Sequence, residues 1–189
     1  MDRFRAERPR HHACGQIPGE CVADFLDELE SCVPALRRYA RALTRDIDRA
    51  DDLVQDCLER AIARRGLFRP RGPLRPWLFT ILTNLHRNAR RTERRRGNHV
   101  DIDAMAELST PAPQPGHLAL AELDRAIGTL PLEQKEALLL VTLEGLGYAE
   151  AAAILGIPTG TLMSRLGRAR ATLRKLTGGP QEPHLRSVK

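Results

Sequence analysis

The chain has 189 residues, of which 42% are hydrophobic and 29% are charged, and its formal net charge is +6. This length and apolar content allow a buried core, which excludes disorder throughout. Only seven residues are aromatic (four Phe, two Tyr and one Trp), which argues against a β-sandwich. A core built on Ala, Leu and Ile is typical of small helical domains, and we expect an all-α protein.

The 30 basic residues comprise 27 Arg and three Lys. The planar guanidinium donates several hydrogen bonds to phosphates and guanine edges, so this excess favours an anionic polymer as partner. A codon bias toward Arg would give the same ratio. The positions of the arginines are therefore more informative than their number.

Four cysteines, Cys14, Cys21, Cys32 and Cys57, form no CxxC pair and lack the dense spacing of a secreted disulfide scaffold. The longest apolar run, Ala137 to Val141, is too short to span a bilayer. We expect a soluble cytoplasmic protein with no membrane contact. His11, His12, Cys14 and Cys21 could in principle hold zinc or sense redox, but their spacing matches no strong metal signature, and we expect no metal.

The pattern along the chain predicts two helical domains joined by a flexible Pro-rich linker. Three prolines between Pro111 and Pro115 disfavour helix, and Gly178-Gly179-Pro180 ends the second helical block. The expected organisation is a flexible tail over 1–21, a first domain over 22–97, a linker over 98–117, a second domain over 118–177 and a tail over 178–189.

The segment "ADDLVQDCLERAIARR", residues 50–65, predicts an amphipathic helix. Its apolar stripe consists of Leu53, Val54, Cys57, Leu58, Ala61 and Ile62. Its opposite face carries Asp52, Gln55, Asp56 and Glu59. That acidic face is either simply solvated or the docking surface for a basic partner. Cys57 lies within the stripe, which predicts a core residue rather than a reactive thiol.

A second helix is predicted over 77–97, with an apolar first half and a basic second half. Trp77, Leu78, Ile81, Leu82 and Leu85 recur at helical spacing, whereas six Arg and one Glu lie between Arg87 and Arg96. A run this dense repels itself unless an anion neutralises it. Because the run continues from a buried helix, it would form a fixed basic ridge, and we expect it to contact nucleic acid.

The stretch "AAILGIPTGTLMSRL" from Ala152 predicts a helix-turn-helix. Gly156 suits a left-handed turn, and Pro158 suits the start of the second helix. Leu162, Leu166, Ala169 and Leu173 give that helix one buried edge, and Thr161, Ser164, Arg165 and Arg168 then face outward. Small and charged donors on such a helix can read the major groove, although a purely structural hairpin has the same turn.

Three stretches in this order resemble the extracytoplasmic-function sigma factors, the smallest group of bacterial sigma factors. "RADDLVQDCLERA" is similar to their polymerase-binding helix, and "PWLFTILTNLHRNARR" is similar to their minus-10 segment. "LPLEQKEALLLVTLEGLGYAEAAAILGIPTGTLMSRLGRAR" is similar to their minus-35 domain. The resemblance covers about residues 30–176. It implies an alternative sigma factor that binds core RNA polymerase and promoter DNA and is controlled by an anti-sigma factor in a stress response.

The resemblance also implies roles for individual residues. The polymerase-binding residues would be Asp52, Gln55, Asp56 and Glu59. The minus-10 contacts would be Asn84, Arg87, Asn88, Arg90 and Arg91, with Asn84 holding a flipped base. The minus-35 contacts would be Thr161, Met163, Ser164, Arg165, Gly167 and Arg168. Met163 and Gly167 depart from the usual basic and larger side chains, which leaves the promoter sequence open.

Two alternatives remain. A helix-turn-helix regulator would explain residues 130–176 but would not need the acidic helix or the Arg-rich helix. A sigma-like decoy that only occupies an anti-sigma factor is expected to lose its basic DNA-facing residues, which this chain keeps at 87–96 and 165–170. No nucleophile constellation, nucleotide-binding loop or pair of catalytic acids stands out, so we expect no enzyme activity, no cofactor and no small-molecule substrate.

Overall fold

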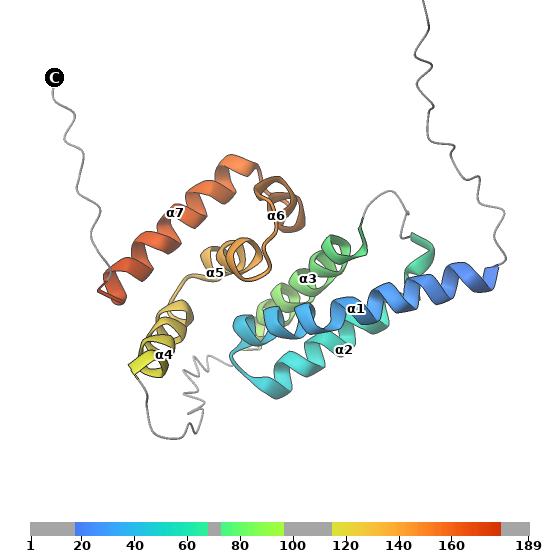
Figure 1. Cartoon of the computed structure of the whole chain (residues 1–189), viewed down its shortest axis with the longest axis horizontal. Helices are drawn as coiled ribbons and strands as arrows, with labels where there is room; N and C mark the ends of the chain where they lie inside the picture. The colour runs from blue at the N-terminus through green and yellow to red at the C-terminus, as the bar shows by residue number, and fades with distance from the viewer. Residues whose placement is uncertain (1–17, 68–72, 97–114, 179–189) are drawn as a thin grey trace, which may run out of the picture.

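The computed structural model describes residues 18–67, 73–96 and 115–178, and over these residues it is helical and without strands. The prediction of an all-α protein is therefore confirmed. Figure 1 shows the helices in two blocks. The first block contains α1 (Pro18–Thr44), α2 (Ile47–Ala63), the short 3-10 helix η1 (Arg65–Leu67) and α3 (Leu74–Arg95). The second contains α4 (Pro115–Gly128), α5 (Leu132–Leu138), the π-helical turn η2 (Leu139–Leu143), α6 (Tyr148–Leu155) and α7 (Thr159–Leu176).

In the first block, α1, α2 and α3 pack around a common core. A tight turn joins α1 to α2, with Arg45 at a φ of 57° and the Asp46 carboxylate accepting a hydrogen bond from the Arg49 backbone N–H at 3.0 Å. This N-cap fixes the start of α2. In the core, the rings of Tyr39 and Phe79 meet edge to face with their centroids 5.2 Å apart.

The second block contains the predicted helix-turn-helix. Gly156 adopts a left-handed φ of 67° after α6, and its N–H donates to the Ala153 carbonyl at 3.1 Å. A residue with a Cβ is strained in this conformation, so glycine allows the chain to reverse here. Pro158 immediately precedes α7 instead of occupying its first turn. Leu162, Leu166 and Ala169 are buried, as the periodicity predicts.

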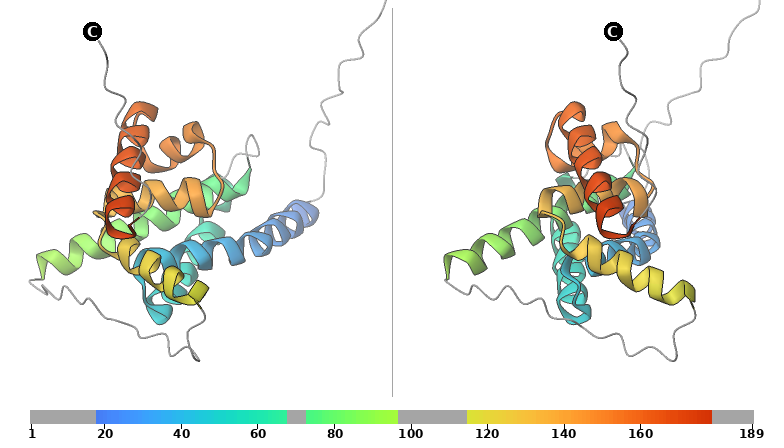
Figure 2. Two further views of the ribbon diagram at one scale, coloured as in Figure 1. Left: turned by 60° about the vertical axis from the view of Figure 1, so that its left-hand side comes forward. Right: turned by 90° about the vertical axis from the view of Figure 1, so that its left-hand side faces the viewer.

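The two blocks pack against each other. Helix α3 lies against α6, and α1 contacts η2, so the buried hydrophobic residues of both blocks form one continuous cluster. Figure 2 shows this packing from two further sides, with the last turns of α3 extending beyond the other helices. The sequence predicted two domains on a tether and did not predict this contact. Most of the expected linker lies outside the described residues.

Some local features differ from the sequence-based expectation. Helix α1 begins at Pro18 rather than near Val22, and Pro is well suited to a first helical position. Helix α4 begins at Pro115, inside the expected linker, for the same reason. Ile62 of the predicted apolar stripe is exposed, whereas its neighbour Ala61 in the same last turn of α2 is buried. Within the described ranges, none of the helices has the length and apolarity needed to cross a membrane.

Candidate protein and nucleic-acid interfaces

The acidic face of α2 is open to solvent. Asp52, Gln55, Asp56 and Glu59 are all exposed, opposite the buried Leu53, Cys57 and Ala61. The Gln55 amide donates to the Glu59 carboxylate at 3.0 Å. Neighbouring Asp51 differs, because it lies 3.6 Å from Arg37 and 3.7 Å from Arg41 on α1. The exposed acids thus remain available to a basic partner, whereas Asp51 holds α2 to α1.

Cys57 is a core residue. Its thiol is fully buried and donates a long hydrogen bond to the Leu78 carbonyl, with 3.5 Å between Sγ and O. Burial raises the pKa of this thiol to about 12, so it stays protonated at neutral pH. The thiolate is the reactive form, and a structural role therefore follows.

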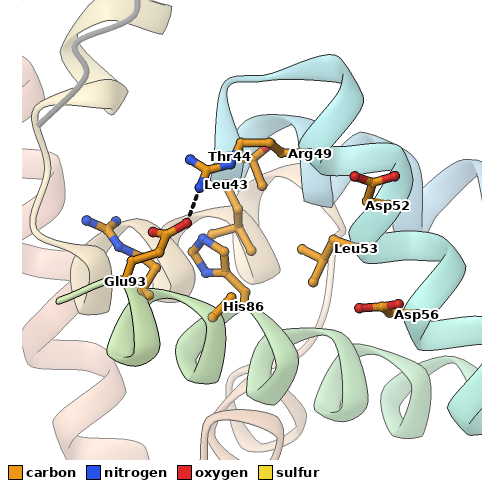
Figure 3. Close-up of a pocket in the computed structure, with 10 residues that line it drawn as sticks. Leu43, Thr44, Arg49, Asp52, Leu53, Asp56, His86 and Glu93 are labelled. Atoms are coloured by element: carbon orange, nitrogen blue, oxygen red, sulfur yellow. Dashed lines mark hydrogen bonds and ion pairs between the residues drawn. The ribbon is translucent and has the colours of Figure 1, made fainter. Parts of the chain in front are cut away.

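A pocket of about 310 Å³ separates the acidic face of α2 from the basic half of α3. Figure 3 shows Asp52 and Asp56 on one side, an ion pair between Arg49 and Glu93 on another, and His86 between them. His86 was not predicted as a site residue from the sequence, although it occupies a core-facing position of α3. Its ring is buried, and its Nδ1 has no hydrogen-bond partner among the described residues.

The pKa of His86 is lowered to about 4, by burial first and then by the nearby charges of Arg90, Lys135, Arg49 and Arg87. The ring is therefore neutral at physiological pH. Among the described residues, no group of three or more His, Cys, Asp or Glu could hold a metal ion. The candidate donors His11, His12 and Cys14 lie outside these residues, as does the side chain of Cys21.

The predicted minus-10 residues divide into two sets. Asn84, Asn88 and Arg91 are exposed and follow one another at intervals of four and three along α3, which places them on one face of the helix. Arg90 is half-buried beside the pocket. The face carrying Asn84, Asn88 and Arg91 is free to meet a ligand.

Arg87 is placed differently, because its guanidinium points into the seam between the blocks. Its Nε and Nη2 donate to the two carboxylate oxygens of buried Glu136 at 3.0 and 2.6 Å, and its Nη1 donates to the Leu155 carbonyl at 3.3 Å. Hydrogen bonding to Glu136 raises the pKa of Arg87. Of the predicted minus-10 residues, Arg87 is the one that the second block engages.

A second buried acid, Glu144, also binds arginines of the first block. Arg38 donates to its two carboxylate oxygens at 3.0 and 2.7 Å, and Arg75 donates to the carboxylate at 2.8 Å. Neither buried glutamate was predicted from the sequence. Their signal was an acid at each end of the apolar run "EALLLVTLE", residues 136–144.

The helix-turn-helix presents a polar groove along α7. Its lining residues are Pro131, Glu133, Gln134, Gly160, Thr161, Ser164, Arg165 and Arg168. Of the predicted minus-35 residues, Thr161, Met163, Ser164, Gly167 and Arg168 are exposed. Arg165 is mostly buried and pairs with Glu133 at 2.8 Å. A Cβ at Gly167 would meet nothing within 4 Å, so packing does not require glycine there.

Two family models match the chain. The Sigma2 domain of PhyR matches residues 29–83, and Sigma-70 region 4 matches residues 120–173. The ECF RNA polymerase sigma factor EcfG of Rhodopseudomonas palustris is 43% identical over 150 residues, which span 79% of this chain and 83% of that relative. The chain belongs to the ECF RNA polymerase sigma factors. This sigma factor therefore acts in transcription initiation, with core RNA polymerase and promoter DNA as its partners.

Solved structures of sigma factors have the same architecture. The sigma factor RpoE of Bartonella quintana, in complex with the anti-sigma factor NepR, has 37% sequence identity and a TM-score of 0.72, over 84% of this chain and 99% of that one. CnrH, in complex with the cytosolic domain of CnrY, has 28% identity and a TM-score of 0.56, over 86% of this chain and 88% of that one. Both matches extend over the two helical blocks.

Proposed function

We propose that this sigma factor binds core RNA polymerase through the acidic face of α2 and promoter DNA through two basic surfaces. Asp52, Gln55, Asp56 and Glu59 would contact the polymerase. The observation that supports this assignment is their common exposure on one helical face, with neither Asp52 nor Asp56 in an ion pair with another described residue. Unpaired, hydrated acids on a fixed helix provide electrostatic complementarity to a basic surface.

The minus-10 element would be bound by the α3 residues, namely Asn84, Arg87, Asn88, Arg90 and Arg91. Asn84 lies closest to the apolar half of α3, where apolar side chains would shield an unstacked base from water. The arginines that follow can neutralise backbone phosphates. The minus-35 element would be bound by Thr161, Met163, Ser164, Arg165, Gly167 and Arg168. Thr161, Ser164 and Arg168 share the polar groove along α7.

These surfaces suggest the division of the chain. Residues 22–97 would form the sigma region-2 domain, 98–117 the linker and 118–177 the region-4 domain, with tails at 1–21 and 178–189. The spans matched by the family models lie inside these two domains. The protein would work in the cytoplasm, where polymerase and promoters are found, as a non-catalytic factor without cofactor or small-molecule substrate.

We also propose control by an anti-sigma factor similar to NepR, in a stress response. The support is the likeness to the Bartonella quintana sigma factor, whose structure was solved with NepR bound, and this chain covers nearly all of that structure. Such a partner would prevent initiation by covering the acidic face of α2, the DNA-binding face of α3 or the polar groove along α7.

In vitro transcription with purified core polymerase and genomic fragments tests the proposal. We expect promoter-dependent initiation, and we expect the triple variant Asn84→Ala, Asn88→Ala and Arg91→Ala to reduce it strongly. Arg125→Ala on α4 is the matched control, because it removes one exposed positive charge outside the proposed surfaces.

Two outcomes would contradict this assignment. Binding to an anti-sigma factor without initiation on any fragment would indicate the sigma-like decoy. Duplex binding that does not require core polymerase, again without initiation, would indicate a helix-turn-helix regulator.

A further inference from the structure

We propose that Glu136 and Glu144 of the second block form an internal docking surface for arginines of the first block, and that this surface holds the free sigma factor closed. In the closed state, Arg87 binds a carboxylate of its own chain instead of promoter DNA. The masking part of this proposal rests on the assignment of Arg87 to the minus-10 surface. The closure itself rests only on the contacts between the blocks.

The geometry at Arg87 resembles the binding of a phosphate. A guanidinium recognises carboxylates and phosphates through the same paired N–H donors. Here Nε and Nη2 are both used by Glu136, at 3.0 and 2.6 Å, and Nη1 is used by the Leu155 carbonyl at 3.3 Å. All three nitrogens of Arg87 are therefore occupied, and no nitrogen is left without a partner for a DNA phosphate.

Glu144, at the other end of the apolar run, provides a second contact between the blocks. Its carboxylate is buried and accepts hydrogen bonds from Arg38 on α1 and from Arg75 on α3. The Arg75 Nη2 also donates to the Glu144 backbone carbonyl at 2.9 Å. A further ion pair joins Arg45 to Asp124 at 3.1 Å. Arginines of α1 and α3 thus both hold Glu144, at the end of η2, against the first block.

Closure and DNA binding by Arg87 exclude each other for an electrostatic reason. If Arg87 moved to a phosphate while the blocks stayed packed, Glu136 would remain buried without a partner. An unpaired buried charge is strongly unfavourable, so the blocks must separate to hydrate this carboxylate. Separation then also exposes Glu144. The two glutamates therefore couple release of the arginines to opening of the whole seam.

Small-angle X-ray scattering of the full-length chain tests the closure. The double variant Glu136→Gln and Glu144→Gln keeps the side-chain volumes and removes both charges. We expect its radius of gyration to exceed that of the wild type. Glu133→Gln is the matched control, because Glu133 also lies in α5 and pairs with Arg165 inside the second block. Circular dichroism checks that each variant retains its helices.

A charge exchange makes the test independent of simple destabilisation. Arg87→Glu alone and Glu136→Arg alone should each open the seam, because each places like charges together. The two substitutions combined should restore the compact radius of gyration. An unchanged radius in the folded Gln double variant, or no recovery in the exchanged pair, would overturn the closure.

Fluorescence anisotropy with a short labelled DNA duplex of random sequence, at low salt and without polymerase, tests the masking. The apparent affinity of a closed protein is reduced by the fraction that is open, so the Gln double variant should bind several-fold more tightly than the wild type. Adding Arg87→Gln to that variant should remove most of the gain. A larger radius without tighter binding would overturn the masking and the DNA role of Arg87 while supporting the closure.

Discussion

Asp52 and Asp56 of α2 and the two glutamates that flank the apolar run of α5 and η2 have opposite environments. Asp52 and Asp56 lie opposite the apolar stripe of their helix and are exposed. Glu136 and Glu144 lie beside the residues that form the core, and both are buried against arginines. The position of an acid relative to the apolar face thus decides whether it is left for an external partner or is paired within the chain.

The largest effect on stability should come from breaking a buried pair. Arg87→Met leaves Glu136 buried without its partner, which should lower the free energy of unfolding by up to about 3 kcal/mol. Arg91→Met removes an exposed arginine four residues later, and we expect a change within about 0.5 kcal/mol. Urea denaturation measures both. If both substitutions lowered the free energy of unfolding equally, the pair between Arg87 and Glu136 would not contribute more than an exposed arginine does.

A charge reversal on α2 should act on function and leave stability nearly unchanged. Asp52→Lys with Asp56→Lys should reduce transcription with core polymerase on the order of 100-fold, since like charges would then meet at the interface. Run-off transcription and co-elution with core polymerase report the loss, and Glu122→Lys on α4 is the control. An unchanged yield of transcript would exclude this face as the polymerase contact.

The buried imidazole of His86, in the pocket between α2 and α3, predicts that stability depends on pH. His86 has a pKa near 4 in the folded protein and an ordinary value of 6.5, so below pH 6.5 the unfolded chain binds a proton that the folded chain does not. Stability should therefore fall from pH 6.5 to about pH 4, by on the order of 2 kcal/mol from this group. In His86→Gln, the loss over this pH range should be smaller by that amount. If the stability of the wild type and of His86→Gln depended on pH in the same way, His86 would not be the group responsible.

The smallest of these effects should appear on α7. Arg168→Gln should weaken binding to a minus-35 duplex by about 1 kcal/mol and reduce the salt dependence of binding, because one phosphate contact is lost. Arg125→Gln on α4 is the control, because Arg125 is exposed and lies outside the proposed DNA-binding surfaces. Equal losses in both variants would point to a general effect of charge rather than to a contact at the groove.

The sequence predicted features that depend on local pattern. Helices α2 and α3, the left-handed turn at Gly156 and the exposed acids of α2 all follow from apolar periodicity and from the conformational freedom of glycine. The seam between the blocks was not predictable in this way. Arg87 and Glu136 are 49 residues apart, and Arg38 and Glu144 are 106 apart. No periodicity within a helix encodes such pairs, so Arg87 could be placed on the basic ridge but not in the seam.

Arg87 and Glu136 belong to the same polypeptide chain, and this limits how a regulator can separate them. Because both groups belong to one chain, their encounter has an effective concentration that does not depend on the amount of protein present. Diluting the protein in the cell cannot lower that value. Polymerase, promoter or an anti-sigma partner therefore competes with the Glu136 carboxylate, whose effective concentration at Arg87 is constant. A higher concentration of free sigma factor increases the number of open molecules but does not change the fraction of molecules that is open.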